Sequence, residues 1–117
     1  EFLKYYEKLL EYEYWLDIID ERNSCSKTDH DATMCATKMD YYCNTGLSRP
    51  CYNAQIAVSD GVIVNAELYQ RPADSKTFIP FMERYKEYNG EYPKHPMADA
   101  GYGSFENYMY CTDKKWN

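Results

Sequence analysis

The sequence is poor in basic charge and lacks the segments that mark secreted or membrane-spanning chains. Thirteen lysines and arginines stand against nineteen aspartates and glutamates, so the formal net charge is -6 at pH 7. This balance is opposite to the positive surface of a protein that binds nucleic acid on its own. No stretch of roughly 18 apolar residues and no secretory signal segment is visible. We expect a soluble, intracellular protein whose contacts with any DNA are local or supplied elsewhere.

The five cysteines do not form the pattern of a disulfide framework or of a zinc ribbon. Their number is odd, and no pair has the Cys-x-x-Cys spacing. We therefore expect free thiols in a reducing cytoplasm. A zinc site made of Cys25, His30, Cys35 and Cys43 is an alternative, although the spacing of these ligands matches no common zinc motif.

The first part of the chain combines a helix with polar loops. Apolar residues recur at alternating steps of three and four along residues 2–19, which predicts an amphipathic helix. The stripe consists of Phe2, Tyr5, Leu9, Tyr12, Leu16 and Ile19. Its spacing favours packing on a partner helix or on a second copy, and packing on a sheet is the alternative. Residues 21–33 predict a loop, and residues 34–51 receive no assignment because Gly46 and Pro50 interrupt regular structure.

The second half predicts a β-hairpin and two helices. Alternating apolar residues make strands of residues 52–58 and 62–69, joined by a three-residue turn that contains Gly61. Asp74 or Ser75 is expected to cap the next helix, which ends at Gly90. The inner face of that helix is expected to hold Phe78, Phe81 or Met82, Tyr85 and Tyr88. Ser104 is expected to cap a last helix, from Phe105 to about Cys111.

The most informative stretch is Met97-Ala98-Asp99, followed by Ala100-Gly101-Tyr102-Gly103-Ser104. It predicts a short apolar strand that carries one carboxylate at its end, followed by a glycine turn and a helix start. Open α/β sheets bind ligands at the carboxyl ends of their strands, and glycines let a substrate approach the backbone. Asp99 is therefore the candidate metal-ligating residue. The alternative is a turn aspartate that bonds only to the local backbone.

Three blocks in this order resemble the DDE transposases of bacterial insertion sequences. They are residues 26–33 (Ser-Lys-Thr-Asp-His-Asp-Ala-Thr), 53–58 (Asn-Ala-Gln-Ile-Ala-Val) and 98–104 (Ala-Asp-Ala-Gly-Tyr-Gly-Ser). The resemblance implies an α/β (α+β) fold, namely part of a ribonuclease-H-like domain with a helix, a hairpin, a helix, a short strand and a helix. It also implies two divalent cations, Mg²⁺ or Mn²⁺, and catalysis of DNA cleavage and strand transfer in the intact parent, whereas we expect the segment itself to hold no cation stably.

The resemblance places the catalytic carboxylates in the order Asp, Asp, Glu, and Asp99 matches the second. The chain begins at Glu1 and not at a methionine, so we interpret it as an internal segment whose first aspartate and glutamate lie outside it. Asp31-Ala32-Thr33 imitates the block that carries the first aspartate in some related transposases. Because polar residues precede it where an apolar strand is expected, Asp31 is not expected to be catalytic.

These interpretations divide the chain into a helical segment (residues 1–20), a loop-rich linker (21–51) and a partial catalytic core (52–117). The parent would bind insertion-sequence ends and target DNA in the bacterial cytoplasm, associated with the nucleoid. The segment itself is expected to be inactive. The alternative is a non-enzymatic module that binds a protein, or itself, through the first helix.

Tyr102 either leans over bound DNA or packs in the core. Turn or surface roles are expected for Asp60, His30 and His95, and core positions for Tyr5, Tyr12, Tyr85 and Tyr88.

Overall fold

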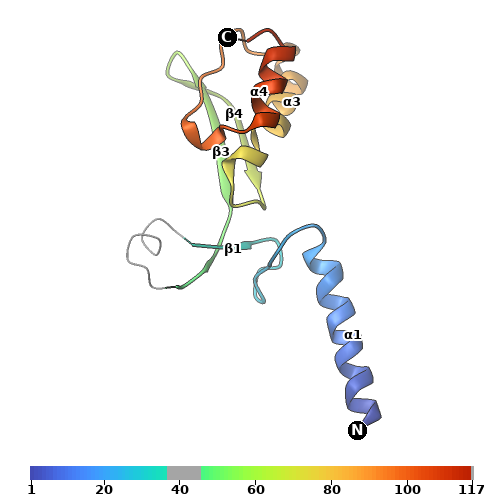
Figure 1. Cartoon of the computed structure of the whole chain (residues 1–117). Coiled ribbons are helices and arrows are strands. Elements are labelled where there is room, and N and C mark those ends of the chain that lie inside the picture. The colour runs from blue at the N-terminus through green and yellow to red at the C-terminus, as the bar shows by residue number, and fades with distance from the viewer. Residues whose placement is uncertain (37–45, 117) are drawn as a thin grey trace. The chain divides into compact units, whose positions relative to one another are not determined.

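The structure is a computed structural model, which describes residues 1–36 and 46–116 (Figure 1). In these residues it contains three α-helices and two antiparallel sheets of two strands each, which confirms the α+β prediction. The chain divides into two compact units, Glu1–Cys51 and Tyr52–Asn117. None of the helices within the described ranges has the length and apolar character of a membrane span.

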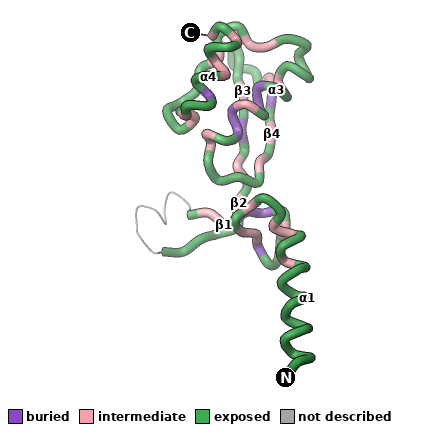
Figure 2. The backbone as a smooth tube through the Cα atoms, turned by 45° about the vertical axis from the view of Figure 1, so that its right-hand side comes forward, coloured by how far each residue is buried: buried purple, intermediate pink, exposed green. Residues whose placement is uncertain are grey.

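Helix α1 (Phe2–Ile19) opens the first unit, and none of its residues is buried. Figure 2 shows it exposed along most of its length, and Phe2 is 85% exposed. The core positions expected for Tyr5 and Tyr12 are therefore wrong, because these side chains are 71% and 60% exposed. The Arg22 side chain binds the end of the helix, since it donates hydrogen bonds to the carbonyls of Ile18 (2.7 Å) and Ile19 (3.3 Å).

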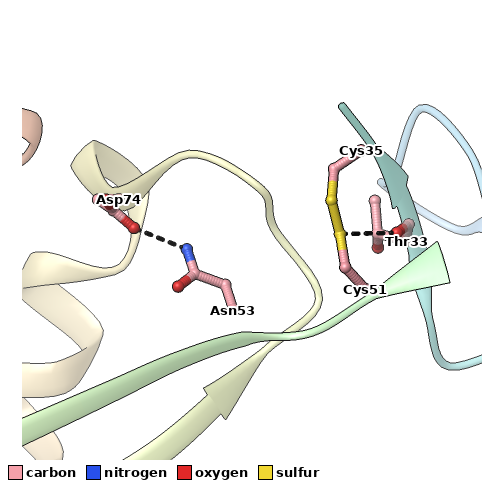
Figure 3. The surroundings of a disulfide bond; sticks show 5 residues. All are labelled: Thr33, Cys35, Cys51, Asn53 and Asp74. Carbon is pink, nitrogen blue, oxygen red and sulfur yellow. Dashed lines mark hydrogen bonds between the residues drawn. A yellow bond between two sulfur atoms is a disulfide. The ribbon is translucent and has the colours of Figure 1, made fainter. Parts of the chain in front are cut away.

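Strand β1 (Thr33–Cys35) pairs with β2 (Arg49–Cys51), a sheet that the sequence patterns did not predict. Thr33 lies opposite Cys51 and Cys35 opposite Arg49, so the two cysteines are diagonal neighbours with Cα atoms 6.4 Å apart. A disulfide joins them, and the Cys51 sulfur contacts the Thr33 carbonyl oxygen (Figure 3).

This disulfide corrects the expectation of free thiols for two of the cysteines. It brings together residues 16 positions apart, in a stretch without a clear strand pattern. Cys25 and Cys111 are free, and Cys43 lies outside the described residues. The alternative zinc site is incompatible with the disulfide, because Cys35 cannot be both bonded to Cys51 and a thiolate ligand.

The second unit begins with the predicted hairpin, formed by β3 (Asn53–Ser59) and β4 (Val62–Tyr69). Its turn has two residues, one fewer than expected, with φ of 51° at Asp60 and 80° at Gly61. Positive φ at both positions is the geometry of the turn that matches the twist of a hairpin. Asp60 is exposed in this turn, as expected.

The hairpin buries its polar face and exposes its apolar face, which is the reverse of the usual arrangement. Gln55 and Asn65 are buried, whereas Ile56 is 57% exposed and Leu68 is 68% exposed. The polar face is the inner one because it lies against the elements that follow the hairpin in sequence. In the described residues, nothing in this unit covers the apolar face.

Helix α3 (Phe78–Asn89) supplies the buried apolar cluster of this unit: Phe78, Phe81 and Met82. Its start is later than predicted, because Asp74 and Ser75 belong to a separate 3-10 turn, η1 (Asp74–Lys76), and Thr77 takes the N-cap position. Gly90 ends the helix with φ of 81°, as predicted. Tyr85 is half-buried, but Tyr88 is 64% exposed, so its predicted core position is wrong.

The predicted strand at Met97 is not formed. Residues 97–99 have no ladder partner in the described part of the chain, and Met97 is 96% exposed. An extended segment becomes a strand only when a neighbour accepts its backbone hydrogen bonds. The 3-10 turn η2 (Ala100–Tyr102) follows, and then helix α4 (Phe105–Asp113), where the Ser104 side chain accepts the hydrogen bond of the Asn107 amide at 3.2 Å, as predicted.

Candidate functional site

Asp99 is exposed at the N-cap position of η2. Its Oδ1 accepts a hydrogen bond of 2.6 Å from the Gly101 amide, which fixes the carboxylate over the turn. A Cβ on residue 101 would lie 2.9 Å from this oxygen, so the glycine makes room for the carboxylate. This local bond is what the turn-aspartate interpretation predicts, and it also leaves the anionic group on the surface, where it can reach a ligand.

A cavity of about 760 Å³ lies beside Asp99. Its walls come from β3, from α3 and from the stretch of residues 91–99, with Gln55, Phe78 and Lys94 among the lining residues. The backbone that follows the hairpin thus runs along one side of the cavity and delivers Asp99 to it. Asp99 is the only one of the predicted carboxylate candidates that lies in this unit.

A polar network lies under the turn that Asp99 caps. The half-buried Asp74 carboxylate accepts hydrogen bonds from the amide groups of Asn53 (2.9 Å) and Gln55 (3.0 Å), and the first of these is drawn in Figure 3. The Gln55 Nε2 also donates to Asn53 Oδ1 at 2.6 Å, and the Tyr102 hydroxyl donates to Gln55 Oε1. Four residues from β3, η1 and η2 are therefore joined side chain to side chain.

Asn107 of α4 joins the same two turns from its buried position. Its Nδ2 donates to the backbone oxygens of Ser75 (2.8 Å) and Tyr102 (2.6 Å). Thr77, which is fully buried, donates through its hydroxyl to the Asp74 carbonyl at 2.8 Å. Buried polar groups are costly unless paired, so these bonds specify how η1 and η2 are placed.

Tyr102 belongs to this packed network. Its ring meets the Phe78 ring edge-on, with centroids 6.1 Å apart, and its hydroxyl is bonded to Gln55. Burial raises the pKa of Tyr102, and the negative charges of Asp74 and Asp99 raise it further. The packing interpretation of Tyr102 describes its position in this structure.

Of the other residues weighed from the sequence, His95 lines the same cavity as Asp99, whereas Asp31 and His30 belong to the first unit. Asp31 is exposed just before β1, and its backbone oxygen accepts a hydrogen bond from Arg22 at 3.1 Å. A carboxylate at the start of a strand does not have the placement that the resemblance requires. His30 is half-buried with its ring against Trp15, at 5.4 Å between centroids, and His95 is exposed.

Sequence patterns missed the network residues Asn53, Gln55, Asp74 and Asn107. One sequence pattern does indicate this network. Asn53 and Gln55 alternate with the apolar Ala54 and Ile56 along β3, so polar side chains share one face of the strand. The contacts of Asp74 with Asn53 and Gln55, and that of Asn107 with Ser75, join residues 19 to 32 positions apart, and no local pattern reports them.

An exposed aspartate held by a glycine turn next to a sheet and a cavity defines a candidate carboxylate site of an α+β protein. A family model described as Transposase DDE domain matches residues 25–117. The chain therefore belongs to the transposase DDE domain family. No match was found in the comparisons with curated proteins and with solved structures.

Membership of this family implies DNA as partner and a divalent metal as cofactor. The Asp99 carboxylate fits one ligand of such a hard cation, since it is an anionic oxygen donor held in place by the backbone. Within the described ranges, however, no group of three or more His, Cys, Asp or Glu side chains is placed to hold a metal ion. The fit is therefore to one ligand and not to a complete site.

Proposed function

We propose that this chain is the Asp99-bearing portion of a DDE transposase catalytic domain, and that its parent cleaves and joins the DNA of an insertion sequence. The observation that carries the proposal is the exposed Asp99 carboxylate on its capped turn, beside the cavity, in a chain of the transposase DDE domain family. Asp99 would be the second of the three carboxylates and a ligand of Mg²⁺ or Mn²⁺.

The number of carboxylates explains why the segment alone is proposed to be inactive. Phosphoryl transfer of this class uses two divalent cations about 4 Å apart, which stabilise the attacking and leaving oxygens. A single carboxylate does not hold two such ions. The residues of the chain contribute position and charge: the Gly101 amide orients Asp99, and the buried network holds the turn that carries it.

The cavity supports a partial ribonuclease-H-like architecture for residues 52–117. In that fold the strand with the first aspartate lies between the hairpin and the segment that carries the second. Here the cavity lies between β3 and residues 91–99, which is the corresponding place. Residues 1–20 would then end a helical insertion, and residues 21–51 would link it to the core.

Strand cleavage tests this proposal. We expect the purified 117-residue chain to leave supercoiled DNA intact with magnesium or manganese, and robust nicking that is lost in Asp99→Asn would contradict the inactive-segment claim.

The DNA that flanks this segment should encode an Asp-bearing apolar strand upstream and a Glu-bearing helix downstream. A longer chain that includes both should nick DNA, and retention of that activity in Asp99→Asn would rule out the ligand role.

The remaining parts of the proposal concern where and on what the parent acts. Its substrates would be the ends of an insertion sequence and a target DNA. It would work in the bacterial cytoplasm and be associated with the nucleoid while on DNA. Family membership supports DNA as the substrate.

A second candidate function is a non-enzymatic module that self-associates through α1. The observation that favours it is the exposure of the apolar stripe, with Phe2 at 85%, Leu9 at 54% and Leu16 at 68%. Sedimentation velocity at several concentrations separates the two functions. A concentration-dependent dimer that is lost in Leu9→Glu, but kept in the control Lys8→Glu, would favour the module. A folded species that stays monomeric would exclude self-pairing through this stripe.

A further inference from the structure

The Asp74 carboxylate lies at one end of a chain of side-chain hydrogen bonds that reaches the Asp99 turn. Its Oδ1 binds the amide groups of Asn53 and Gln55, and its Oδ2 lies 3.4 Å from the position that a Cβ on Gly101 would occupy. Asp99 Oδ1 lies 2.9 Å from the same position. The two carboxylates thus flank one glycine, Asp74 on the side of the hairpin and Asp99 on the exposed side.

The chemistry of the Asp74 carboxylate fixes which groups donate and which accept in this series of hydrogen bonds. An ionised carboxylate only accepts hydrogen bonds, so Gln55 must turn its NH₂ group toward Asp74. The Gln55 oxygen then faces away, where it accepts the Tyr102 hydroxyl. Tyr102 is the last residue of the three-residue turn whose N-cap is Asp99. A reversal of the Gln55 amide would place its oxygen against Asp74 Oδ1 and Asn53 Oδ1, which are both acceptors.

We infer that Asp74 is a positioning residue for Asp99: through Gln55 and Tyr102 it fixes the turn that presents the Asp99 carboxylate. This inference rests on the proposed role of Asp99 as a metal ligand. The buried Asn107 completes the arrangement, because it binds the backbone oxygens of Ser75 and Tyr102 at once and so couples the turn next to Asp74 to the turn next to Asp99. Asp74 itself does not touch the cation in this assignment.

The experiment measures the water-exchange rate of the Gly101 amide, the group that donates to Asp99, by NMR on the metal-free 117-residue chain. Asp74→Ala should speed this exchange about tenfold, and Tyr102→Phe about threefold, because each removes hydrogen bonds that hold the turn. Asp74→Asn should stay within about twofold of wild type, since the amide oxygen still accepts from Asn53 and Gln55. Amides of the β3–β4 ladder serve as internal reference, and Glu91→Gln as the control variant.

The pattern across variants separates positioning from general stability. A role in stability alone would speed exchange at the ladder amides together with Gly101, and this result would overturn the inference. Unchanged Gly101 exchange in both Asp74→Ala and Tyr102→Phe would overturn it as well. If Asp74→Ala fails to fold, Tyr102→Phe decides the matter, because it removes one hydroxyl and keeps the ring against Phe78.

Line broadening by Mn²⁺ distinguishes this inference from the proposed function. Broadening around Asp99 that persists in Asp74→Asn and disappears in Asp99→Asn supports both. Its loss in Asp74→Asn, with unchanged Gly101 exchange, would make Asp74 a metal ligand and overturn the positioning role. Absence of broadening in the wild-type chain counts against the ligand role of Asp99 in the proposed function, while the exchange rates still decide whether Asp74 fixes the turn.

Discussion

Gly101 is the residue whose replacement should most directly disturb Asp99. A Cβ at this position would lie 2.9 Å from Asp99 Oδ1, so Gly101→Ala should push the carboxylate off the residue 101 amide. We expect a loss of about 1 kcal/mol of unfolding free energy, the typical value for a lost N-cap bond. Urea unfolding of Gly101→Ala in the wild-type and Asp99→Ala backgrounds measures it. An equal cost in both backgrounds would show that Asp99 is not the cause.

Single residues differ in how well the sequence predicts their contacts. The placement of Asp99 on a glycine turn and the Ser104 cap follow from neighbours within three positions, and both are present. The anchoring of Tyr102 does not follow from its neighbours, because its hydroxyl partner Gln55 is 47 positions away. The sequence therefore predicted the glycine turn that follows Asp99, but not the network beneath it.

At the scale of elements, local signals predict the hairpin but not the structure of three short segments: residues 97–99, Thr33–Cys35 and Arg49–Cys51. The alternation of β3 and β4, with a tight turn between them, predicts the hairpin from local signals alone. The strand character of residues 97–99 needs a partner that local sequence cannot supply. Conversely, Thr33–Cys35 and Arg49–Cys51 pair despite weak strand signals, and the Cys35–Cys51 disulfide joins them.

A single carboxylate, that of Glu83, joins α3 to α4 and should make this unit sensitive to acid. Glu83 accepts hydrogen bonds from the hydroxyls of Tyr110 (2.7 Å) and Tyr92 (2.8 Å), and Lys114 lies 4.0 Å away. The Tyr110 bond, followed by that of Tyr92, lowers the pKa of Glu83. A lowered folded-state pKa stabilises the fold above the unfolded pKa, and this stabilisation is lost as pH falls through the folded value.

Glu83→Gln should therefore flatten the acid side of the stability profile. Thermal unfolding followed by circular dichroism, from about pH 6 to about pH 3, should show a smaller loss of stability for this variant than for wild type. Glu91→Gln replaces an exposed carboxylate of the same unit and serves as control. A variant profile that falls as steeply as the wild-type profile would contradict the role assigned to Glu83.

At the scale of the whole molecule, the charge distribution sets an expectation for DNA binding by the isolated chain. The net charge is -6, and the paired cations of the described residues include Lys76 with Glu106, Arg84 with Glu87, and Lys114 with Glu83, each within 4.0 Å. Binding to duplex DNA without sequence preference depends on lysines and arginines that neutralise phosphates and release counterions. These paired cations, in an acidic chain, provide little of that driving force.

We therefore expect no saturable binding of a short labelled duplex at protein concentrations below about 100 µM in about 0.15 M salt, measured by fluorescence anisotropy. The family's DNA contacts would then depend on parts of the parent outside this chain. Affinity in the micromolar range, falling steeply between about 50 mM and about 200 mM salt, would contradict this expectation, because it would require several phosphate contacts from within these 117 residues. Weak binding that is insensitive to salt would instead indicate contact through exposed aromatic side chains, such as those of α1, and not through charge.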